Sequence, residues 1–338
     1  MKINIKELKQ ALAIVKPGLA AKELIEQSTS FAFMNNGVTT YNDEIALYSP
    51  IKDLELEGAI KAEELYGFLQ KVKKDEIDVE ITDNEIQFTA GRIKAGFTLQ
   101  QEITLPLDSL KKKGKWFPIP DDFCHYLSLA MGSTGRDMSQ PKLTCVNITK
   151  EGNMTGSDGY KIMHCETGQE LPIVTFLLPA SSATEVISLN PTHISEGKGW
   201  VHFQSKEKTV LSCRIFEEDV YPEVTNALKV EGIELTFPQT IDEILERAAV
   251  FAKRGHILDE SIVITIENNR LKTKAKSDTG WIEETVNIRY NDDPLLFSFT
   301  PFLLKGILKE THNFILGERA MKFEGAGWVY LSMLRNVK

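Results

Sequence analysis

The sequence has no long apolar run, no closely spaced cysteines and no surplus of basic residues. No segment approaches the roughly 18 consecutive apolar residues of a membrane span, and Met1–Lys6 has no signal-peptide core. The four cysteines, Cys124, Cys145, Cys165 and Cys213, lie far apart without a CxxC pair. We therefore expect reduced, buried thiols in a cytoplasmic protein with no membrane segment.

The chain has fewer basic than acidic residues, and this bears on whether its partner is a nucleic acid. Lys and Arg total 39 against 48 Asp and Glu, which gives a net charge of −9. Nucleic-acid binders usually carry excess basic residues, so this total speaks against a polyanion partner, although a basic face on an acidic body remains open. With 42% hydrophobic and 26% charged residues, the composition is that of a globular protein and excludes a disordered or collagen-like chain. The 338 residues suffice for two or three domains.

The sequence patterns of common enzymes are also missing. There is no HExxH or other metal-ligand spacing, no GxSxG elbow, no P-loop and no GxGxxG. Asp158-Gly159 is better explained as a turn than as a catalytic loop. We expect no enzymatic activity, no metal and no cofactor. The scattered histidines are His125, His164, His193, His202, His256 and His312.

A repeat with a period of about 60 residues runs through the chain. Six amphipathic segments have the 3.6-residue spacing of helices. The fifth opens with Thr240 and has Glu243 three residues later, which predicts a capping box, and the sixth has Pro301 at its first helical position. The predicted helices are 5–15, 61–72, 120–131, 179–189, 240–253 and 300–312.

Between these helices, alternating apolar residues flank polar turns, which predicts β-hairpins. One helix and a strand meander, six times over, predict an α+β architecture of three tandem domains, each with two helices on antiparallel sheets. We place the domains at 1–112, 113–228 and 229–338, and a polar linker marks the first boundary. The predicted strands are 31–34 with 38–41, 78–81 with 86–89, 146–148 before a turn at 150–153, 200–203 with 210–213, 262–266 with 271–273, and 314–316 with 321–323.

Four segments, in this order on the repeat, resemble the bacterial sliding clamp, the beta subunit of DNA polymerase III. Residues 156–162, Gly-Ser-Asp-Gly-Tyr-Lys-Ile, match the family's Ala-Thr-Asp-Gly-His-Arg-Leu run. Residues 217–224 look like its Phe-Pro-Asp-Tyr turn, 245–251 like its Arg-Ala-Ala helix, and 329–335 like its closing strand. Tyr160-Lys161 replaces His-Arg, a departure that fits a divergent member such as one from a phage or prophage.

The resemblance covers the whole chain and implies a non-enzymatic processivity factor. Two three-domain chains would close head to tail into a homodimeric ring around duplex DNA, without regard to base sequence. Peptide tails of DNA polymerase and of the clamp loader would bind a hydrophobic cleft.

In the family the repeat helices line the hole, where positive charge attracts phosphates without contacts to bases. Counted with their flanking residues, the six helical segments sum to +3, which leaves −12 on the rest of the chain, although the middle domain adds little to the lining. The segments counted are 5–17, 61–74, 120–136, 180–190, 239–254 and 300–312. Each expected contact could also be an ordinary solubilising residue. The expected DNA contacts are Lys6, Lys9, Lys16, Lys22, Lys71, Lys73, Lys74, Arg136, Lys253, Arg254, Lys305 and Lys309.

The resemblance also implies a partner-peptide cleft between the middle and third domains. A flexible Met in an apolar groove suits a site that accepts several peptides. For Leu143, Ile162 and Leu331, ordinary strand core is the alternative. The implied cleft residues are Leu143, Ser157, Gly159, Tyr160, Lys161, Ile162, Pro179, Leu331 and Met333.

The implied dimer interface joins the first domain of one chain to the third domain of the other. It would place Phe97, Thr98 and Leu99 against Val250 and Phe251, although Phe97 could equally be core. Two other functions remain open. A repeat scaffold that binds peptides without enclosing DNA would explain the weakly charged middle helices, and an unrecognised enzyme is the second alternative.

Overall fold

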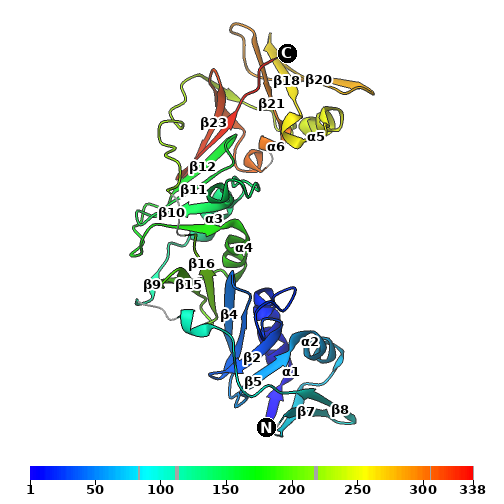
Figure 1. Cartoon of the computed structure of the whole chain (residues 1–338). Helices are drawn as coiled ribbons and strands as arrows, with labels where there is room; N and C mark the ends of the chain where they lie inside the picture. The colour runs from blue at the N-terminus through cyan, green and yellow to red at the C-terminus, as the bar shows by residue number, and fades with distance from the viewer. Residues whose placement is uncertain (83, 111–113, 217–219, 305, 338) are drawn as a thin grey trace. The chain divides into compact units, whose positions relative to one another are not determined.

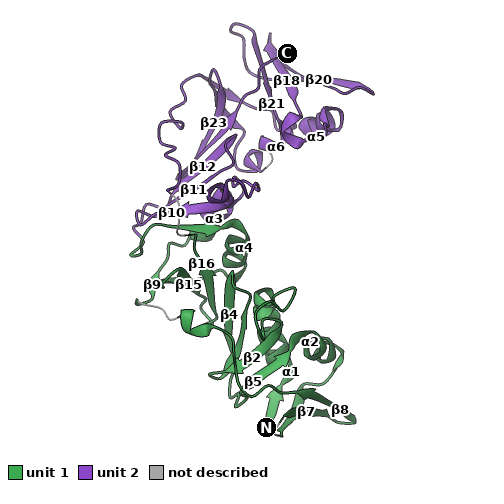
Figure 2. Ribbon diagram, in the orientation of Figure 1, with its two compact units in different colours: residues 1–124, 171–217 green, residues 125–170, 218–338 purple. Residues whose placement is uncertain are grey.

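The computed structural model describes residues 1–338 except 83, 111–113, 217–219, 305 and 338 (Figure 1). The chain forms two compact units, residues 1–124 with 171–217 and residues 125–170 with 218–338 (Figure 2). These units differ from the three predicted domains, whose division stays a prediction; the first predicted boundary lies outside the described residues. Among the described residues, no helix is long and apolar enough to cross a membrane.

Helices form at all six predicted places and begin at residues 5, 62, 123, 180, 241 and 301. The apolar stripes that predicted them are buried, as for Leu8 and Leu12 in the first helix and Leu65 and Leu69 in the second. The helices are α1 (Ile5–Val15), α2 (Ala62–Lys71), α3 (Phe123–Met131), α4 (Ala180–Leu189), α5 (Ile241–Ala252) and α6 (Pro301–Leu304). Short 3-10 turns are η1 (Lys16–Gly18), η2 (Leu107–Leu110), η3 (Pro141–Thr144), η4 (Ile257–Asp259) and η5 (Ile307–Lys309).

Two predicted helix details are wrong. Thr240 precedes α5, but its side chain makes no capping hydrogen bond, so the predicted capping box does not form. The sixth helix is much shorter than 300–312, because Gly306 has φ +102° and only the 3-10 turn η5 follows it.

The predicted hairpins form, and asparagine pairs make two of their turns. Asn35 and Asn36 have φ of 51° and 54°, and Asn268 and Asn269 have φ of 49° and 59°. Asn tolerates this left-handed region better than most residues, and two successive positive φ values match the twist of a tight hairpin. The four cysteines are free thiols; three are buried, and Cys124 is half-buried.

Antiparallel sheets build both units. Unit 1 contains the orders β1-β6-β7-β8 and β5-β2-β3-β4-β16-β15-β14-β9. Unit 2 contains the orders β10-β11-β12-β24-β23-β22-β17 and β20-β19-β18-β21. The strands of unit 1 are β1 (Lys2–Asn4), β2 (Ser30–Met34), β3 (Gly37–Tyr41), β4 (Ile45–Pro50), β5 (Gly58–Lys61), β6 (Glu76–Ile81), β7 (Glu85–Ala90), β8 (Ile93–Thr98), β9 (Phe117–Pro118), β13 (Phe176–Pro179), β14 (His193–Glu196), β15 (Trp200–Gln204) and β16 (Val210–Arg214). Those of unit 2 are β10 (Cys145–Ile148), β11 (Asn153–Ser157), β12 (Lys161–Glu166), β17 (Ile233–Thr236), β18 (Ile262–Glu267), β19 (Arg270–Lys276), β20 (Trp281–Asn287), β21 (Leu295–Phe299), β22 (Asn313–Leu316), β23 (Ala320–Gly325) and β24 (Trp328–Met333).

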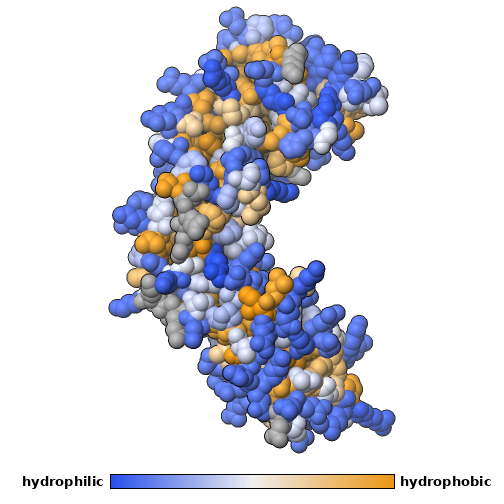
Figure 3. All heavy atoms as spheres, in the orientation of Figure 1, coloured by the Kyte–Doolittle hydropathy of each residue, from blue (hydrophilic) through white to orange (hydrophobic). Residues whose placement is uncertain are grey.

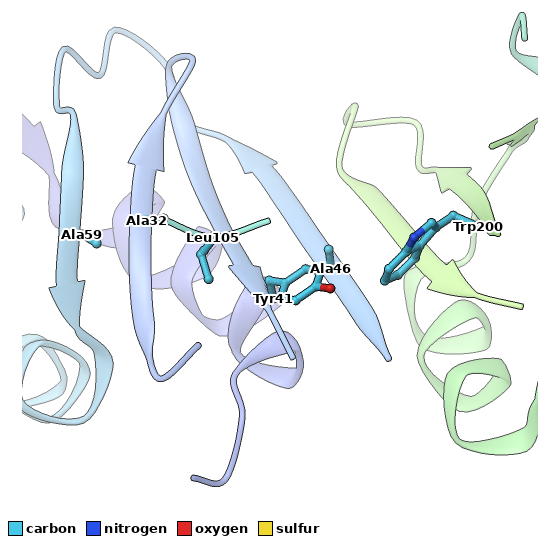
Figure 4. Close-up of a cluster of buried hydrophobic side chains, with 6 residues drawn as sticks. All are labelled: Ala32, Tyr41, Ala46, Ala59, Leu105 and Trp200. Atoms are coloured by element: carbon cyan, nitrogen blue, oxygen red, sulfur yellow. The ribbon is translucent and has the colours of Figure 1, made fainter. Parts of the chain in front are cut away.

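The longer sheet of unit 1 is covered on both faces, which explains why every residue of β3 is buried. Helix α1 packs on β3 and β4, and α2 packs on β2 and β5. Leu105, from the segment after β8, packs with a cluster of buried side chains of this sheet (Figure 4). That cluster contains Ala32, Tyr41, Ala46, Ala59 and Trp200. The small alanines leave room for the covering segment.

Two strand pairs, β4 with β16 and β12 with β24, share one register. Ile45 lies opposite Cys213 in the first pair, and Lys161 lies opposite Ser332 in the second. One residue beyond, the amide of Arg214 donates to the Glu44 carbonyl at 2.8 Å, and the amide of Met333 donates to the Tyr160 carbonyl at 2.9 Å. We call these pairs junction 1 and junction 2. The sequence repeat therefore reappears as a repeated backbone pairing.

Replacement of two glycines by alanine should change the free energy of unfolding in opposite directions. A Cβ on Gly156 would lie 1.9 Å from the Ala130 carbonyl oxygen of α3, whereas Gly67, exposed on α2, has nothing within 4 Å. Gly156→Ala should therefore destabilise by about 1–3 kcal/mol through overpacking. Gly67→Ala should stabilise by about 0.5–1 kcal/mol through helix propensity. Urea-unfolding midpoints measure both; equal shifts would contradict the close approach of α3 to β11.

Candidate functional site

Most of the predicted cleft residues lie together where β12 begins and β24 ends. Eight of the nine belong to unit 2, and the ninth, Pro179, is the last residue of β13 in unit 1. Ser157, Lys161 and Leu331 are buried, whereas Tyr160 and Met333 are 50% and 42% exposed. The predicted set therefore divides into a buried floor and two side chains that reach solvent.

The turn before β12 is fixed by its own side chains. The Asp158 carboxylate accepts hydrogen bonds from the amides of Tyr160 and Lys161, both at 2.9 Å. The Ser157 hydroxyl donates to the Lys161 carbonyl at 2.9 Å and accepts from the Gly159 amide at 3.1 Å. Gly159 has φ +87°, which glycine adopts without strain. This rigid turn, predicted from Asp-Gly, holds the Tyr160 ring outward.

Two hollows adjoin at Tyr160 and Leu258, which line both of them. The larger has a volume of about 710 Å³, and Met333 forms part of its wall. The smaller has a volume of about 520 Å³ and contains Leu143 and Arg136. The smaller hollow is mainly apolar, with Leu143, Leu258 and Phe302 in its lining, whereas the larger one mixes apolar side chains with charged and polar ones. Pockets that combine apolar walls with a few polar groups can bind small ligands and peptides. The larger hollow is lined by Tyr160, Leu258, Asp259, Thr300, Leu303, Glu318, Arg319, Met333, Leu334, Arg335 and Asn336.

Lys161 lies under the site and does not reach into it. Its Nζ donates to the Gly132 carbonyl at 2.7 Å and lies 4.8 Å from the centre of the Phe302 ring. Burial lowers the pKa of the Lys161 ammonium, and Arg136 adds to this effect, whereas Asp158 opposes it. Lys161 therefore holds the floor of the site in place.

Several lining residues were not predicted. Leu258 comes from η4, Phe302 and Leu303 from α6, and Arg319 from the turn before β23. Arg335 fixes the end of the chain, since its guanidinium donates to the Leu258 carbonyl and its amide donates to the Ser298 carbonyl at 2.7 Å. Arg335 carried a sequence signal, as did Leu334, because both belong to the closing-strand motif. The others come from distant segments that no local pattern connects.

Junction 1 has the same backbone as junction 2, but its side chains fill the corresponding place. Asn42 accepts hydrogen bonds from the amides of Glu44 and Ile45, as Asp158 does in junction 2, and Asp43 has φ +74° where Gly159 stands. Arg214 occupies the position of Met333. It forms an ion pair with Asp43 and stacks 4.7 Å above Trp200, whose counterpart is Ala320. Junction 1 is thus closed by an ion pair and a stacked ring.

The predicted DNA contacts lie in several loops and helix ends, and Lys305 lies outside the described residues. Lys6, Lys9 and Lys16 lie on α1 and η1, and Lys71, Lys73 and Lys74 lie at the end of α2 and just after it. Lys22, Lys253 and Lys309 are exposed, as is Arg136 at the rim of the smaller hollow. Hydrophilic residues cover much of the face shown in Figure 3.

Three of these cations also make structural contacts, and the Lys16 Nζ lies 4.7 Å from the centre of the Tyr66 ring. Lys9 is half-buried, and its Nζ donates to the Val72 carbonyl at 2.9 Å, which links α1 to the end of α2. Arg254 donates to the carbonyls of Lys253 at 2.7 Å and Lys276 at 2.6 Å. These bonds fix both side chains close to the protein surface.

The predicted interface residues lie at two sheet edges. Phe97 packs on Phe68 of α2 and on Phe88, with ring centres 5.5 and 5.6 Å apart; Thr98 is exposed and Leu99 is buried. On α5, Val250 is 60% exposed and Phe251 is half-buried. Within the described residues, β8 is one of the two edge strands of its sheet, opposite β1, and β20 is one of the two edge strands of another sheet, opposite β21.

Potential metal ligands do not gather in the described ranges, where no group of three or more His, Cys, Asp or Glu could hold an ion. No protein-family model matches the chain. No curated protein matches it by sequence either.

Solved structures give a different result, because the fold is similar over the whole chain. The DNA polymerase III subunit beta from Pseudomonas aeruginosa has a TM-score of 0.85 at 16% identity, with 100% of this chain and 99% of that chain covered. The DNA polymerase sliding clamp from Bacillus subtilis has a TM-score of 0.82 at 16% identity, with the same coverage. A sliding clamp from Bartonella birtlesii bound to griselimycin has a TM-score of 0.86 at 14% identity, again with that coverage. The chain has the sliding-clamp fold.

The buried Lys161 makes a testable contribution to the pH dependence of stability. Its pKa is lowered on folding, so the unfolded chain holds this proton to higher pH, and folding gains stability as pH rises toward the ordinary lysine pKa of about 10.4. Between pH 7 and 9.5, urea midpoints of the wild type should therefore rise relative to those of Lys161→Met. The exposed Lys150→Met is the matched control. A pH-independent difference between wild type and Lys161→Met would contradict this assignment.

Proposed function

We propose that this chain is a DNA polymerase processivity factor, a sliding clamp that encircles duplex DNA and tethers polymerase and other partners. The observation that carries the proposal is the similarity of the whole chain to solved clamps, with TM-scores of 0.82 to 0.86 and nearly complete coverage of both chains. A protein of this kind acts in the cytoplasm. It works by enclosing DNA and by binding its partner proteins, without catalysis, cofactor or metal.

The ring is a homodimer that closes head to tail and contains three domains from each chain. The free edges of β8 and β20 support this assembly, because an unpaired strand edge is a ready template for another strand. Phe97, Thr98 and Leu99 lie at one edge, and Val250 and Phe251 lie on the helix beside the other. Each edge meets the opposite edge of the second copy, so two contacts close the ring.

Lysines that line the hole attract the phosphates of the DNA backbone and make no base-specific contacts. Lys71, Lys73 and Lys74 are exposed together at the end of α2, and they are the strongest candidates for this contact. The acidic remainder of the chain, which carries −12 outside the six helical segments and their flanking residues, disfavours DNA elsewhere on the surface.

Peptide tails of polymerase and clamp loader bind the hollows around Tyr160 and Met333. An apolar anchor of the peptide enters the larger hollow, where the flexible Met333 adapts to different side chains. Because Arg214 and Asp43 close junction 1, each chain offers one such site.

A repeat scaffold that binds peptides but does not enclose DNA is the second candidate. One observation favours it: in the middle domain, residues 120–136 and residues 180–190 each carry a net charge of −1. This scaffold would bind the same peptides with no dependence on DNA.

Retention on circular DNA tests the clamp directly. Once loaded by its cognate loader, the protein should stay on nicked circular DNA through a high-salt wash and dissociate after the circle is linearised. Lys71→Glu, Lys73→Glu and Lys74→Glu together should lower loading at least tenfold, because each reversal replaces an attraction to phosphate with a repulsion. Gel filtration of labelled complexes measures retention.

The matched control for the lysine variant is the reversal of Lys206 and Lys208 to Glu, in the exposed turn between β15 and β16. Loading of this control should be unchanged. A wild-type monomer without topological retention would contradict the clamp and favour the scaffold. Normal loading of the triple variant would contradict only the lining assignment.

Junction 2 should lose peptide binding when it is given the side chains of junction 1. Gly159→Asp with Met333→Arg recreates the Asp43–Arg214 pair, and a Cβ at Gly159 meets nothing within 4 Å. We expect at least tenfold weaker binding of a polymerase tail peptide, measured by fluorescence polarisation. The unfolding midpoint should fall modestly, because Asp at position 159 must adopt a positive φ, as Asp43 does in junction 1. Undiminished binding by the folded variant would place the peptide elsewhere.

A further inference from the structure

Three strands, β3, β11 and β19, occupy equivalent places in the repeat, because each ends in the same kind of turn. The amides of Asn42, Asp158 and Ser277, the first residues after these strands, donate to the carbonyls three residues later at 3.1, 3.4 and 2.8 Å. Counting back from these turns aligns the strands residue by residue. The aligned residues are Tyr41, Ser157 and Lys276, and two positions earlier Thr39, Thr155 and Lys274.

On β3 and β11, a segment of the same chain covers the face to which these residues belong. Leu105, from the segment after β8, packs in one cluster with Tyr41 (Figure 4). The buried Tyr221, which precedes β17, lies beside Ser157. The four aligned residues of β3 and β11 are therefore at most 6% exposed, namely Thr39, Tyr41, Thr155 and Ser157.

On β19, the same face is open to solvent and basic. Leu271, Thr273 and Ala275 are buried on the side where α5 packs, and the residues that alternate with them point to the other side. Those residues, which we call the basic stripe, are Arg270, Lys272, Lys274 and Lys276. Lys272 is half-buried and the other three are exposed. Since alternate residues of a strand lie about 6.6–6.8 Å apart, the stripe is roughly 20 Å long.

Positive charge prevails on this face, although the chain as a whole carries −9. Two carboxylates share the face, Glu267 and Glu283, and with the four cations they leave a net charge of +2. Glu283 lies 3.7 Å from Lys272, and among the described residues no other ion pair reaches the stripe. Three of its four cations are therefore available to an anionic partner.

A hollow of about 450 Å³ at one end of the stripe is lined by two arginines, Arg270 and Arg289. Asn269 fixes the loop that carries Arg289, because it accepts hydrogen bonds from the Ile288 amide at 3.0 Å and from the Tyr290 amide at 3.1 Å. Within the described residues, no carboxylate lines this hollow and neither guanidinium has a partner. A carboxylate would suit it, because a guanidinium can bind both carboxylate oxygens.

We propose that the basic stripe and the adjoining arginine hollow bind an extended, acidic segment of a partner protein. An extended peptide has nearly the same residue spacing as β19, so acidic residues at alternate positions can each reach one cation. The site shares no residue with the hollows around Tyr160 and Met333 or with the expected DNA contacts. It goes beyond the proposed function and does not depend on the ring.

Two observations favour a polypeptide over a nucleic acid. On the equivalent faces of β3 and β11, the cover is an extended polypeptide segment. Single-stranded nucleic acids are held by several aromatic rings on which successive bases stack. Within the described part of this face, Trp281, 65% exposed and opposite Lys276, is the one aromatic residue.

Fluorescence polarisation with a defined peptide tests the site in the full chain. The probe is a fluorescein-labelled peptide of alternating Glu and Ser, ten residues long. Lys274→Glu with Lys276→Glu should weaken its binding at least tenfold at low salt, because attraction becomes repulsion. The matched control, Lys206→Glu with Lys208→Glu, changes the net charge equally on exposed residues and should stay within twofold of the wild type. Equal losses in both variants, or no binding by the wild type, would overturn the proposal.

The arginine hollow has its own test with the same probe. Arg289→Gln should weaken binding about fivefold, and Arg289→Lys should recover only part of this loss, because lysine cannot hold a carboxylate in bidentate fashion. Unchanged binding by Arg289→Gln would remove the hollow from the site.

Cross-linking locates the bound probe. A water-soluble carbodiimide joins a Glu carboxylate to a nearby lysine amine as an amide, and the reagent takes up the released water to become a urea. Mass spectrometry should find the probe chiefly on Lys274 and Lys276. Linkage chiefly to lysines outside the stripe would overturn the assignment.

An oligonucleotide of ten thymidines tests the nucleic-acid alternative. It should bind the stripe at least tenfold more weakly than the acidic peptide. Tighter binding of the oligonucleotide, lost in Lys274→Glu with Lys276→Glu, would overturn the acidic partner in favour of a nucleic acid. The same variant should keep the wild-type retention on circular DNA, and loss of that retention would assign the stripe to DNA instead.

Discussion

Backbone hydrogen bonding between strands of different repeats is the constraint on which the rest of the structure depends. A meander of a few strands leaves unpaired edges that cannot stay exposed without risk of association. Junctions 1 and 2 satisfy such edges in one register, with Ile45 opposite Cys213 and Lys161 opposite Ser332. The rigid turn at Asp158, the burial of Lys161 and the position of Met333 all follow from where this pairing ends.

The two junctions show how one backbone serves two purposes. In junction 1, Asp43, Arg214 and Trp200 form an ion pair under a stacked ring, which is a stabilising arrangement. In junction 2, the same positions hold Gly159, Met333 and Ala320, and the volume they leave open becomes a hollow. The hollow arises here by the omission of side chains that close the sister site, and such an omission gives up stability that the sister site keeps.

Local patterns predicted the local structure well. Helical periodicity placed the starts of all six helices within three residues, and the hairpins formed where turn residues such as Asn35-Asn36 stood. Two helix predictions failed. The side chain of Thr240 makes no capping hydrogen bond to α5, and the sixth helix is shorter than predicted because Gly306 has a positive φ. In the site, the Asp-Gly turn and Met333 could be recognised from sequence. Leu258 and Leu303 could not, because long-range packing alone brings them to Tyr160.

The exposed edge strands have a consequence for the single folded chain. Each newly made molecule carries a bare strand next to Phe97 and another that presents Trp281 to water. Indiscriminate stacking of such strands leads to aggregates, and natural edges resist it with inward or flanking charges. Arg92, Lys94 and Glu283 stand at these edges. These charges therefore act as gatekeepers, because they disfavour indiscriminate stacking of one strand edge on another.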